Sequence, residues 1–315
     1  YKRQVHAWAD GSDAREYQTI QEANWWGLLD FPPEPTSDSE LGVLFLGGGH
    51  LDGREVERGG QVSTLLESHA YRVSQRRLRC WRMARFDLGM ARAVSWLRLG
   101  LETLKPDVVV LSLGADELRR SIPEVWSAES GFSRHHPPGD YLDVRAGKLV
   151  EVPRSTRWKG RQSSPRELTT WPGTDVPIGI ASSQPELPAL RNAGVSPWEF
   201  LACCYAELAA TVRRSGADVM LLLTDTGETS GWHRREDGEA LRQRLREHAA
   251  KLADAAGIRC VDPAVTRDAV ESEMGTIHHS DGSWTVAGHE AAARALWQAL
   301  VDTRPVLAPA NPSAR

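Results

Sequence analysis

Short apolar segments alternate with segments of helical spacing along much of this chain, and this alternation strongly limits the folds that it can adopt. Apolar residues dominate 41–46 and 107–113, and two further apolar runs follow at 218–223 and 258–261. Continuous runs of this length are typical of strands that are buried on both faces. Since helical segments separate them, we predict that they form one parallel sheet with helices on both of its faces.

Apolar residues at intervals of three and four indicate the helices between these strands. The pattern that begins at Met90, for example, runs through Val94, Leu97 and Leu101 and stops before Pro106. Residues 71–80 are predicted as a further strand, although arginines interrupt its apolar pattern. The helices are predicted at about 60–70, 90–104, 197–215, 238–256 and about 286–301.

Two segments interrupt the alternation. Residues 1–40 are polar and end in a proline-rich stretch, so we interpret them as a long N-terminal arm. Residues 119–196 contain many prolines, and a hairpin is predicted within them at 140–152. So long a segment with little regular structure is typical of a lid or a docking insertion. The predicted organisation is therefore the arm, an α/β domain at 41–305 that carries the 119–196 insertion, and a tail at 306–315.

Charge and cysteine content argue against several classes of protein. The 315 residues include 38 Lys and Arg against 42 Asp and Glu, a net charge of −4, and no continuous basic tract stands out. Nucleic acid or an anionic membrane is therefore not an expected partner. No run of eighteen apolar residues is present. The cysteines form no C-x-x-C pair, so zinc and redox motifs are absent and free thiols are expected at Cys80, Cys203, Cys204 and Cys260.

Polar residues follow the predicted strands at the edge where parallel sheets bind their ligands. The first strand ends in Gly47-Gly-Gly-His-Leu-Asp-Gly53, and the 107–113 strand ends in Gly114-Ala-Asp-Glu117. The three glycines match no phosphate-binding motif. We predict no metal and no cofactor, because loops at strand ends also collect acidic residues as turn and cap residues. The residues predicted to border one crevice are His50, Asp52, Glu117, Asp225 and His279.

These strand-end blocks resemble those of the SGNH (GDSL-like) hydrolases. Residues 43–53 are similar to the first block of that family, an apolar strand followed by Gly-Asp-Ser. Residues 108–117 resemble its Gly-x-Asn-Asp block, and residues 281–293 resemble its last block, which precedes a helix. The resemblance covers 41–301. It implies a three-layer α/β/α, flavodoxin-like fold of the SGNH hydrolase type.

One branch of that family has a domain that follows a membrane anchor and faces away from the cytoplasm. Residues 22–27 and the hairpin segment Gly147-Lys-Leu-Val150 resemble that branch. The chain also begins at Tyr1 rather than at Met. The resemblance therefore implies an extracytoplasmic, membrane-associated domain, with an anchor expected upstream of Tyr1.

The chain departs from the family pattern at the catalytic positions. The nucleophilic serine falls on Gly49, the oxyanion asparagine on Asp116 and the general-base histidine on Ser283, while the carboxylate partner falls on Ser280 or Asp281. Glycine has no oxygen that attacks a carbonyl. A serine hydroxyl does not take up a proton near neutral pH, and a carboxylate opposes a developing oxyanion. We therefore expect no catalytic residue at these positions.

The leading hypothesis is a catalytically inactive SGNH-like domain. It would act as a binding or structural subunit of an extracytoplasmic, membrane-associated assembly, with a protein partner or a glycan. The alternative is an active esterase, or an O-acyltransferase or hydrolase acting on an acylated glycan, that uses rebuilt or metal-assisted residues. Tryptophans of the arm and insertion suit a protein interface, and those predicted to bind the partner are Trp25, Trp26, Trp126, Trp158 and Trp171.

Overall fold

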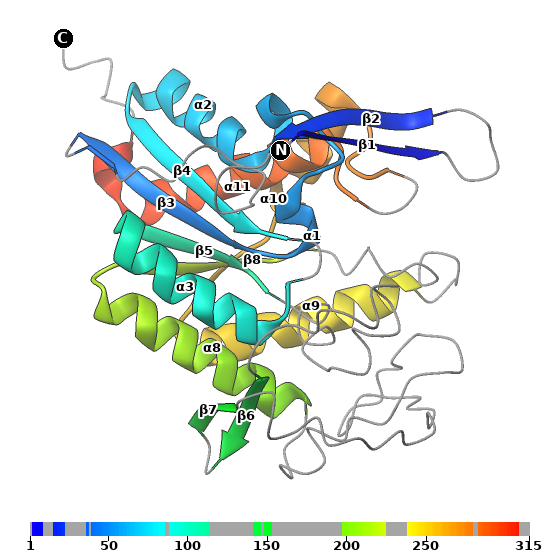
Figure 1. Ribbon diagram of the computed structural model, residues 1–315. Coiled ribbons are helices and arrows are strands. Elements are labelled where there is room, and N and C mark those ends of the chain that lie inside the picture. Colours follow the sequence, from blue (N-terminus) through cyan, green and yellow to red (C-terminus); the bar gives the residue numbers. More distant parts are fainter. Residues whose placement is uncertain are drawn as a thin grey trace.

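The computed structural model describes residues 2–8, 15–22, 36–37, 39–85, 88–113, 141–145, 148–152, 197–224, 238–279 and 283–308. Five strands of this part of the chain form one sheet, in which all pairs are parallel (Figure 1). Numbered along the chain, their order is 2-1-3-4-5, which is the flavodoxin-like order. Across the sheet they are β4 (Arg77–Ala84), β3 (Glu40–Gly47), β5 (Val108–Ser112), β8 (Asp218–Leu222) and β9 (Arg259–Val261).

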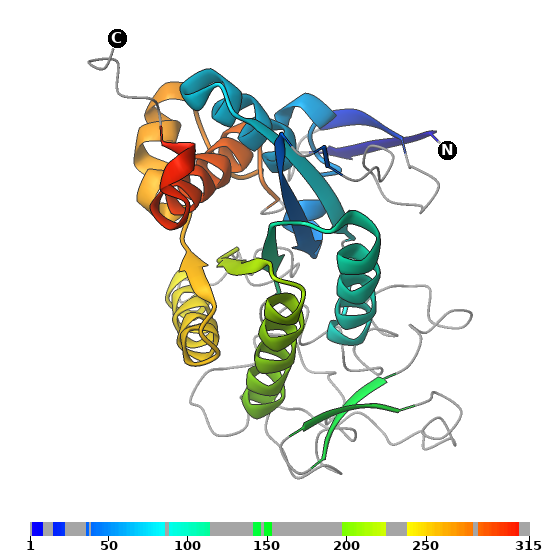
Figure 2. The same cartoon turned by 90° about the vertical axis from the view of Figure 1, so that its left-hand side faces the viewer.

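Helices cover both faces of this sheet. In Figure 2, α3 (Met90–Leu104), α8 (Pro197–Arg214) and α9 (Gly238–Ala255) lie below it. The helices α2 (Val62–Ser74), α10 (Ala264–Met274) and α11 (Val286–Thr303) lie above it. The predicted fold class, a three-layer α/β/α domain with a flavodoxin-like parallel sheet, is therefore confirmed.

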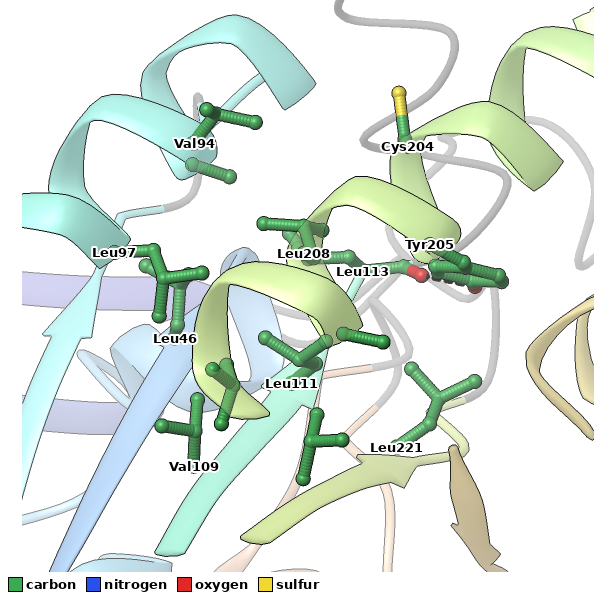
Figure 3. Packing of buried hydrophobic residues seen from close by; sticks show 14 of the residues in the cluster. Leu46, Val94, Leu97, Val109, Leu111, Leu113, Cys204, Tyr205, Leu208 and Leu221 are labelled. Atoms are coloured by element: carbon green, nitrogen blue, oxygen red, sulfur yellow. Dashed lines mark hydrogen bonds between the residues drawn. The ribbon is translucent and has the colours of Figure 1, made fainter. Parts of the chain in front are cut away.

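Alternate residues of each central strand face the two helical layers. In β3, Leu44 and Leu46 pack with the α3 and α8 layer, whereas Val43 and Phe45 pack with the α2 and α11 layer. All four side chains are fully buried. Figure 3 shows the first of these two clusters, with residues of α3 and α8 packed on the sheet. Two-sided burial explains why these strands are continuously apolar in sequence.

The four predicted core strands and the predicted helices are confirmed, with small differences at their ends. The strand predicted at 71–80 is wrong in its position, because α2 continues to Ser74 and β4 begins only at Arg77. The sequence pattern misplaced it because Tyr71 and Val73, which alternate with a charged residue as in a strand, are exposed apolar residues of the last turn of α2. The helix α10 was not predicted; its only fully buried apolar side chain is Val270.

Two antiparallel hairpins lie outside the sheet. The hairpin predicted at 140–152 is confirmed as β6 (Tyr141–Arg145) and β7 (Lys148–Val152), with Arg145 opposite Lys148. The arm contains an unpredicted hairpin of β1 (Lys2–Trp8) and β2 (Arg15–Glu22). It docks through the buried Thr19, whose hydroxyl donates a 2.5 Å hydrogen bond to the carbonyl oxygen of Arg54.

The chain beyond α11 continues into the short 3-10 helix η2 (Pro305–Leu307), whose Leu307 is buried with the α2 and α11 layer. Within the described ranges, none of the helices combines the length and the apolar character that a membrane span requires.

Candidate functional site

The candidate site lies at the carboxyl ends of β3 and β5, the pair of strands at which the strand order reverses. Gly47 ends β3 and pairs with Ser112 of β5, and the single-turn helix α1 (Gly49–Asp52) follows at once. A crevice beyond this reversal point is where open α/β sheets bind their ligands. Gly49, the position to which the sequence resemblance assigns the nucleophile, is the first residue of α1.

Buried polar side chains hold α1 in place. Arg82 of β4 is 3% exposed, and its Nη1 donates hydrogen bonds of 2.9 Å to the carbonyl oxygens of both Leu51 and Asp52. Gln61, which precedes α2, donates from Nε2 to the carbonyl oxygen of Gly53 at 2.7 Å. Gly53 ends α1 in the left-handed region, with φ of 57°. The terminal carbonyl groups of α1 thus have partners in the interior, as buried backbone requires.

A second element reaches the site from far along the chain. His278 and Trp284 form an isolated antiparallel bridge, and the amide of His279 donates to the carbonyl oxygen of Ser283 at 2.8 Å. Thr285 then caps α11, accepting a 3.3 Å hydrogen bond from the amide of Gly288. These bonds fix the position of Ser283, the residue to which the sequence resemblance assigns the general base.

Aromatic rings join the two elements. The His50 ring of α1 lies 4.8 Å from the Trp284 ring between centroids, at an interplanar angle of 30°. The other contact of the indole is edge-to-face, with the His289 ring of α11 at 5.4 Å and 89°. His50 follows Gly49 and Trp284 follows Ser283, so the two positions to which the sequence resemblance assigns a nucleophile and a general base border the same packed cluster.

His289 is the most buried titratable group of this cluster. Its side chain is fully buried, and its Nδ1 accepts a 3.3 Å hydrogen bond from the amide of Val62, which begins α2. Burial lowers the pKa of His289 well below its usual value, and the Arg82 guanidinium and the neighbouring His50 and His279 rings act in the same direction. The imidazole is therefore neutral, with its proton on Nε2. This histidine therefore packs in the interior and caps the first turn of α2 rather than its own helix.

The stability of the domain should fall as the pH is lowered through this histidine's unfolded pKa. A depressed pKa in the folded state contributes stability that is fully present above about pH 6.5 and is lost below it. We expect His289→Asn, which keeps an acceptor for the Val62 amide but does not titrate, to flatten this dependence. Urea unfolding at about pH 7.5 and about pH 5 measures it.

A matched control for this prediction is His248→Asn in α9. The pKa of His248 is also lowered, by burial and then by Lys251, but its side chain is only partly buried. This control should retain most of the wild-type pH dependence. An equal loss of pH dependence in both variants would contradict the role assigned to His289.

The structure brings together five of the residues predicted from the sequence: Gly49, His50, Asp52, His279 and Ser283. The other predicted crevice and catalytic positions lie outside the described residues, namely Asp116, Glu117, Asp225, Asp281 and the alternative Ser280. The predicted partner-binding residues Trp25, Trp26, Trp126, Trp158 and Trp171 also lie outside them. Sequence reasoning missed Arg82, Gln61 and Trp284 as members of this cluster. The one sequence feature that could have pointed to this cluster is Arg82, a charged residue between apolar residues of a strand.

The cysteines and the acidic residues add no reactive group that the structure describes. All four cysteines are free thiols, as predicted. Burial raises the pKa of Cys204 well above its usual value and raises that of Cys260 to about 11, so both thiols are protonated at neutral pH. Across the described ranges, no group of three or more His, Cys, Asp or Glu side chains is placed to hold a metal ion.

A glycine-rich turn after the first strand of a 2-1-3-4-5 sheet and a histidine-containing turn before the last helix meet at one edge of the domain. The fold is SGNH-like. No family model matches the chain, and no curated protein matches it in sequence.

Solved structures resemble this SGNH-like fold at low sequence identity. An acetyl xylan esterase matches with a TM-score of 0.46 and 12% identity, over 82% of this chain and 100% of that one. A psychrotrophic esterase from Pseudoalteromonas matches with a TM-score of 0.46 and 9% identity, over 83% and 97% of the two chains. A lipase/acylhydrolase from Enterococcus faecalis matches with a TM-score of 0.44 and 11% identity, over 84% and 96%. At these values the likeness assigns no activity to this chain.

Proposed function

We propose that this SGNH-like domain has no ester-hydrolase activity at the family position and acts by binding, as a subunit of an extracytoplasmic, membrane-associated assembly. The observation that carries the first half of this proposal is Gly49 itself. It begins α1 directly after the strand that ends at the reversal point, and it offers only backbone atoms there. An acyl-enzyme cannot form without a nucleophilic oxygen or sulfur atom.

The packing of the site also supports loss of catalysis. Gly49 is buried, Ser283 is 3% exposed and His50 is 6% exposed. The side chains that follow the two former catalytic positions pack ring against ring at 4.8 Å. A hydrolase must admit a carbonyl group between its nucleophile and its oxyanion donors. Here the side chains next to Gly49 and Ser283, an imidazole and an indole, are packed against each other.

We expect the purified chain to hydrolyse p-nitrophenyl acetate no faster than its heat-denatured form, and to remain unlabelled by a fluorophosphonate probe. Gly49→Ser should also remain inactive, because Ser283 cannot accept the proton of the new hydroxyl. A Gly59→Ser variant is the matched control, since a Cβ atom at this position would meet no other part of the described structure within 4 Å and the residue lies outside the site.

An active wild-type chain would contradict this proposal. If turnover of the ester were lost in His50→Ala and kept in the Gly59→Ser control, the rebuilt-site alternative would replace it: an esterase, or an O-acyl enzyme acting on a glycan. Addition and removal of divalent metal ions in the same assay would separate a metal-assisted reaction from a metal-free one.

The binding half of the proposal rests on the sequence. The arm and the insertion carry the tryptophans Trp25, Trp26, Trp126, Trp158 and Trp171, and aromatic side chains on loops are typical of protein interfaces. Location outside the cytoplasm rests on the resemblance to the anchored branch of the family. Cross-linking in intact cells, followed by capture of the tagged chain, should yield a membrane-associated partner. Recovery from the cytoplasm alone would refute this location.

A further inference from the structure

The corner between α2 and β4 carries an unusual concentration of arginines for a chain with net charge −4. Residues 68–86 contain six arginines and no acidic residue. One of them, Arg82, is buried beneath α1, so it does not contribute to the surface. Apolar and uncharged polar residues are interspersed among the others, so the sequence shows no continuous basic tract.

The turn itself, residues 71–77, is here called the arginine corner. Six of its seven residues are exposed and Ser74 is half-buried, so the corner projects from the domain. Tyr71 is 52% exposed and Val73 is 41% exposed, beside the exposed guanidinium groups of Arg72, Arg76 and Arg77. In Figure 1 the corner lies at the left end of α2, at the opposite end of the sheet from α1.

Internal hydrogen bonds hold the backbone of the corner. The amide of Gln75 donates to the carbonyl oxygen of Tyr71 at 3.0 Å, and Gln75 ends α2 in the left-handed region. The hydroxyl of Ser74 donates to the carbonyl oxygen of Ala70 at 2.8 Å and accepts from the amide of Arg76 at 3.3 Å. A turn that is already ordered loses little conformational entropy when it binds a partner.

The Arg72 Nε donates a 3.4 Å hydrogen bond to the carbonyl oxygen of Ser68, and no carboxylate of the described residues pairs with the three guanidinium groups of the corner. None of the ion pairs formed within the described ranges involves Arg72, Arg76 or Arg77. Arg77 does act on one acidic side chain, that of Glu40. Hydrogen bonds from Ser37 are the main cause that lowers the pKa of Glu40, and the charges of Arg79 and Arg77 lower it further. The nearby carboxylate of Glu67 accepts a 2.7 Å hydrogen bond from the amide of Cys80.

We infer that the arginine corner is a docking surface for anionic phospholipid headgroups. Guanidinium groups match phosphate oxygens with paired hydrogen bonds. Exposed tyrosine and valine side chains beside them suit the boundary between headgroups and acyl chains, where amphipathic aromatic residues gather. An acidic protein partner is the other occupant that this charge would suit, and the test below separates the two. This inference does not depend on the loss of catalysis, since the corner lies away from the site.

The test is co-sedimentation of the full chain with lipid vesicles at low salt. Wild type should bind vesicles that contain phosphatidylglycerol and should not bind vesicles of phosphatidylcholine alone. The triple variant Arg72→Gln/Arg76→Gln/Arg77→Gln should bind about a hundredfold more weakly, about fivefold for each arginine. Tyr71→Ser/Val73→Ser should also weaken binding, although the charge is unchanged. High salt should release the wild type.

A matched control removes the same charge elsewhere. Arg214→Gln/Arg259→Gln/Arg267→Gln changes three exposed arginines that already pair with Glu207, Asp302 and Asp268. It should bind as the wild type does, and thermal unfolding should show that all variants are folded. Equal losses in the two triple variants would overturn the inference. So would binding to polyglutamate-coated beads without binding to vesicles, which would indicate an acidic protein partner instead.

Discussion

Gly47→Ala should destabilise the domain by about 3 kcal/mol, close to the upper end of what overpacking of a core costs. A Cβ atom at this position would lie 2.4 Å from the carbonyl oxygen of Ser112 and 2.8 Å from its Cβ atom. Both atoms belong to the strand paired with β3, so the clash is relieved only by moving the two strands apart where they carry the candidate site. The midpoint of urea unfolding measures the change.

The control for this prediction is Gly59→Ala. A Cβ atom at Gly59 would meet no other part of the described structure within 4 Å, and this glycine does not have a positive φ angle. Its replacement should therefore change stability by less than about 0.5 kcal/mol. A Gly47→Ala variant as stable as this control would show that β3 and β5 separate easily at their carboxyl ends. The packed site described above would then be incorrect.

Arg82→Met should destabilise the domain by a similar amount, about 3 kcal/mol. The substitution removes the donor that satisfies the carbonyl oxygens of Leu51 and Asp52, both in buried residues of α1. Each buried acceptor left without a partner costs about 1–3 kcal/mol, and the methionine side chain recovers part of this through packing. Urea unfolding again measures the change, and the helix α1 should lose its fixed position.

An exposed arginine of the same strand provides the comparison. Arg77→Met changes the same chemical groups at the first residue of β4, where the side chain is exposed. It should alter stability by less than about 0.5 kcal/mol. If Arg82→Met were equally mild, the buried guanidinium could not be what holds α1 against the sheet.

The parts of the fold that the sequence predicted well are those whose burial is two-sided. Val108–Ser112 is a strand in which every residue is buried. Its continuous run of apolar residues was sufficient to predict it. The hairpin of the insertion was predicted from its short central turn. The hairpin of the arm was missed, because β1 and β2 are polar and pair only with each other.

The site was predicted in part. Strand-end glycines and the last block placed Gly49 and Ser283 at one edge of the sheet, and the structure packs their chain neighbours His50 and Trp284 together. Arg82 was missed because a charged residue in a sequence is read as exposed, and its burial depends on the carbonyl groups that α1 presents to it.

The sequence by itself determined the class of the fold and the absence of a nucleophile at position 49. Both follow from local properties: the periodicity of apolar residues and the identity of one residue after a strand. Only the tertiary structure decided that His50, Trp284 and His289 form one cluster and that Arg82 is buried while Arg77, five residues earlier, is exposed. Those outcomes depend on crossovers that bring strand ends and helix ends together over more than 200 residues of chain, which no local pattern records.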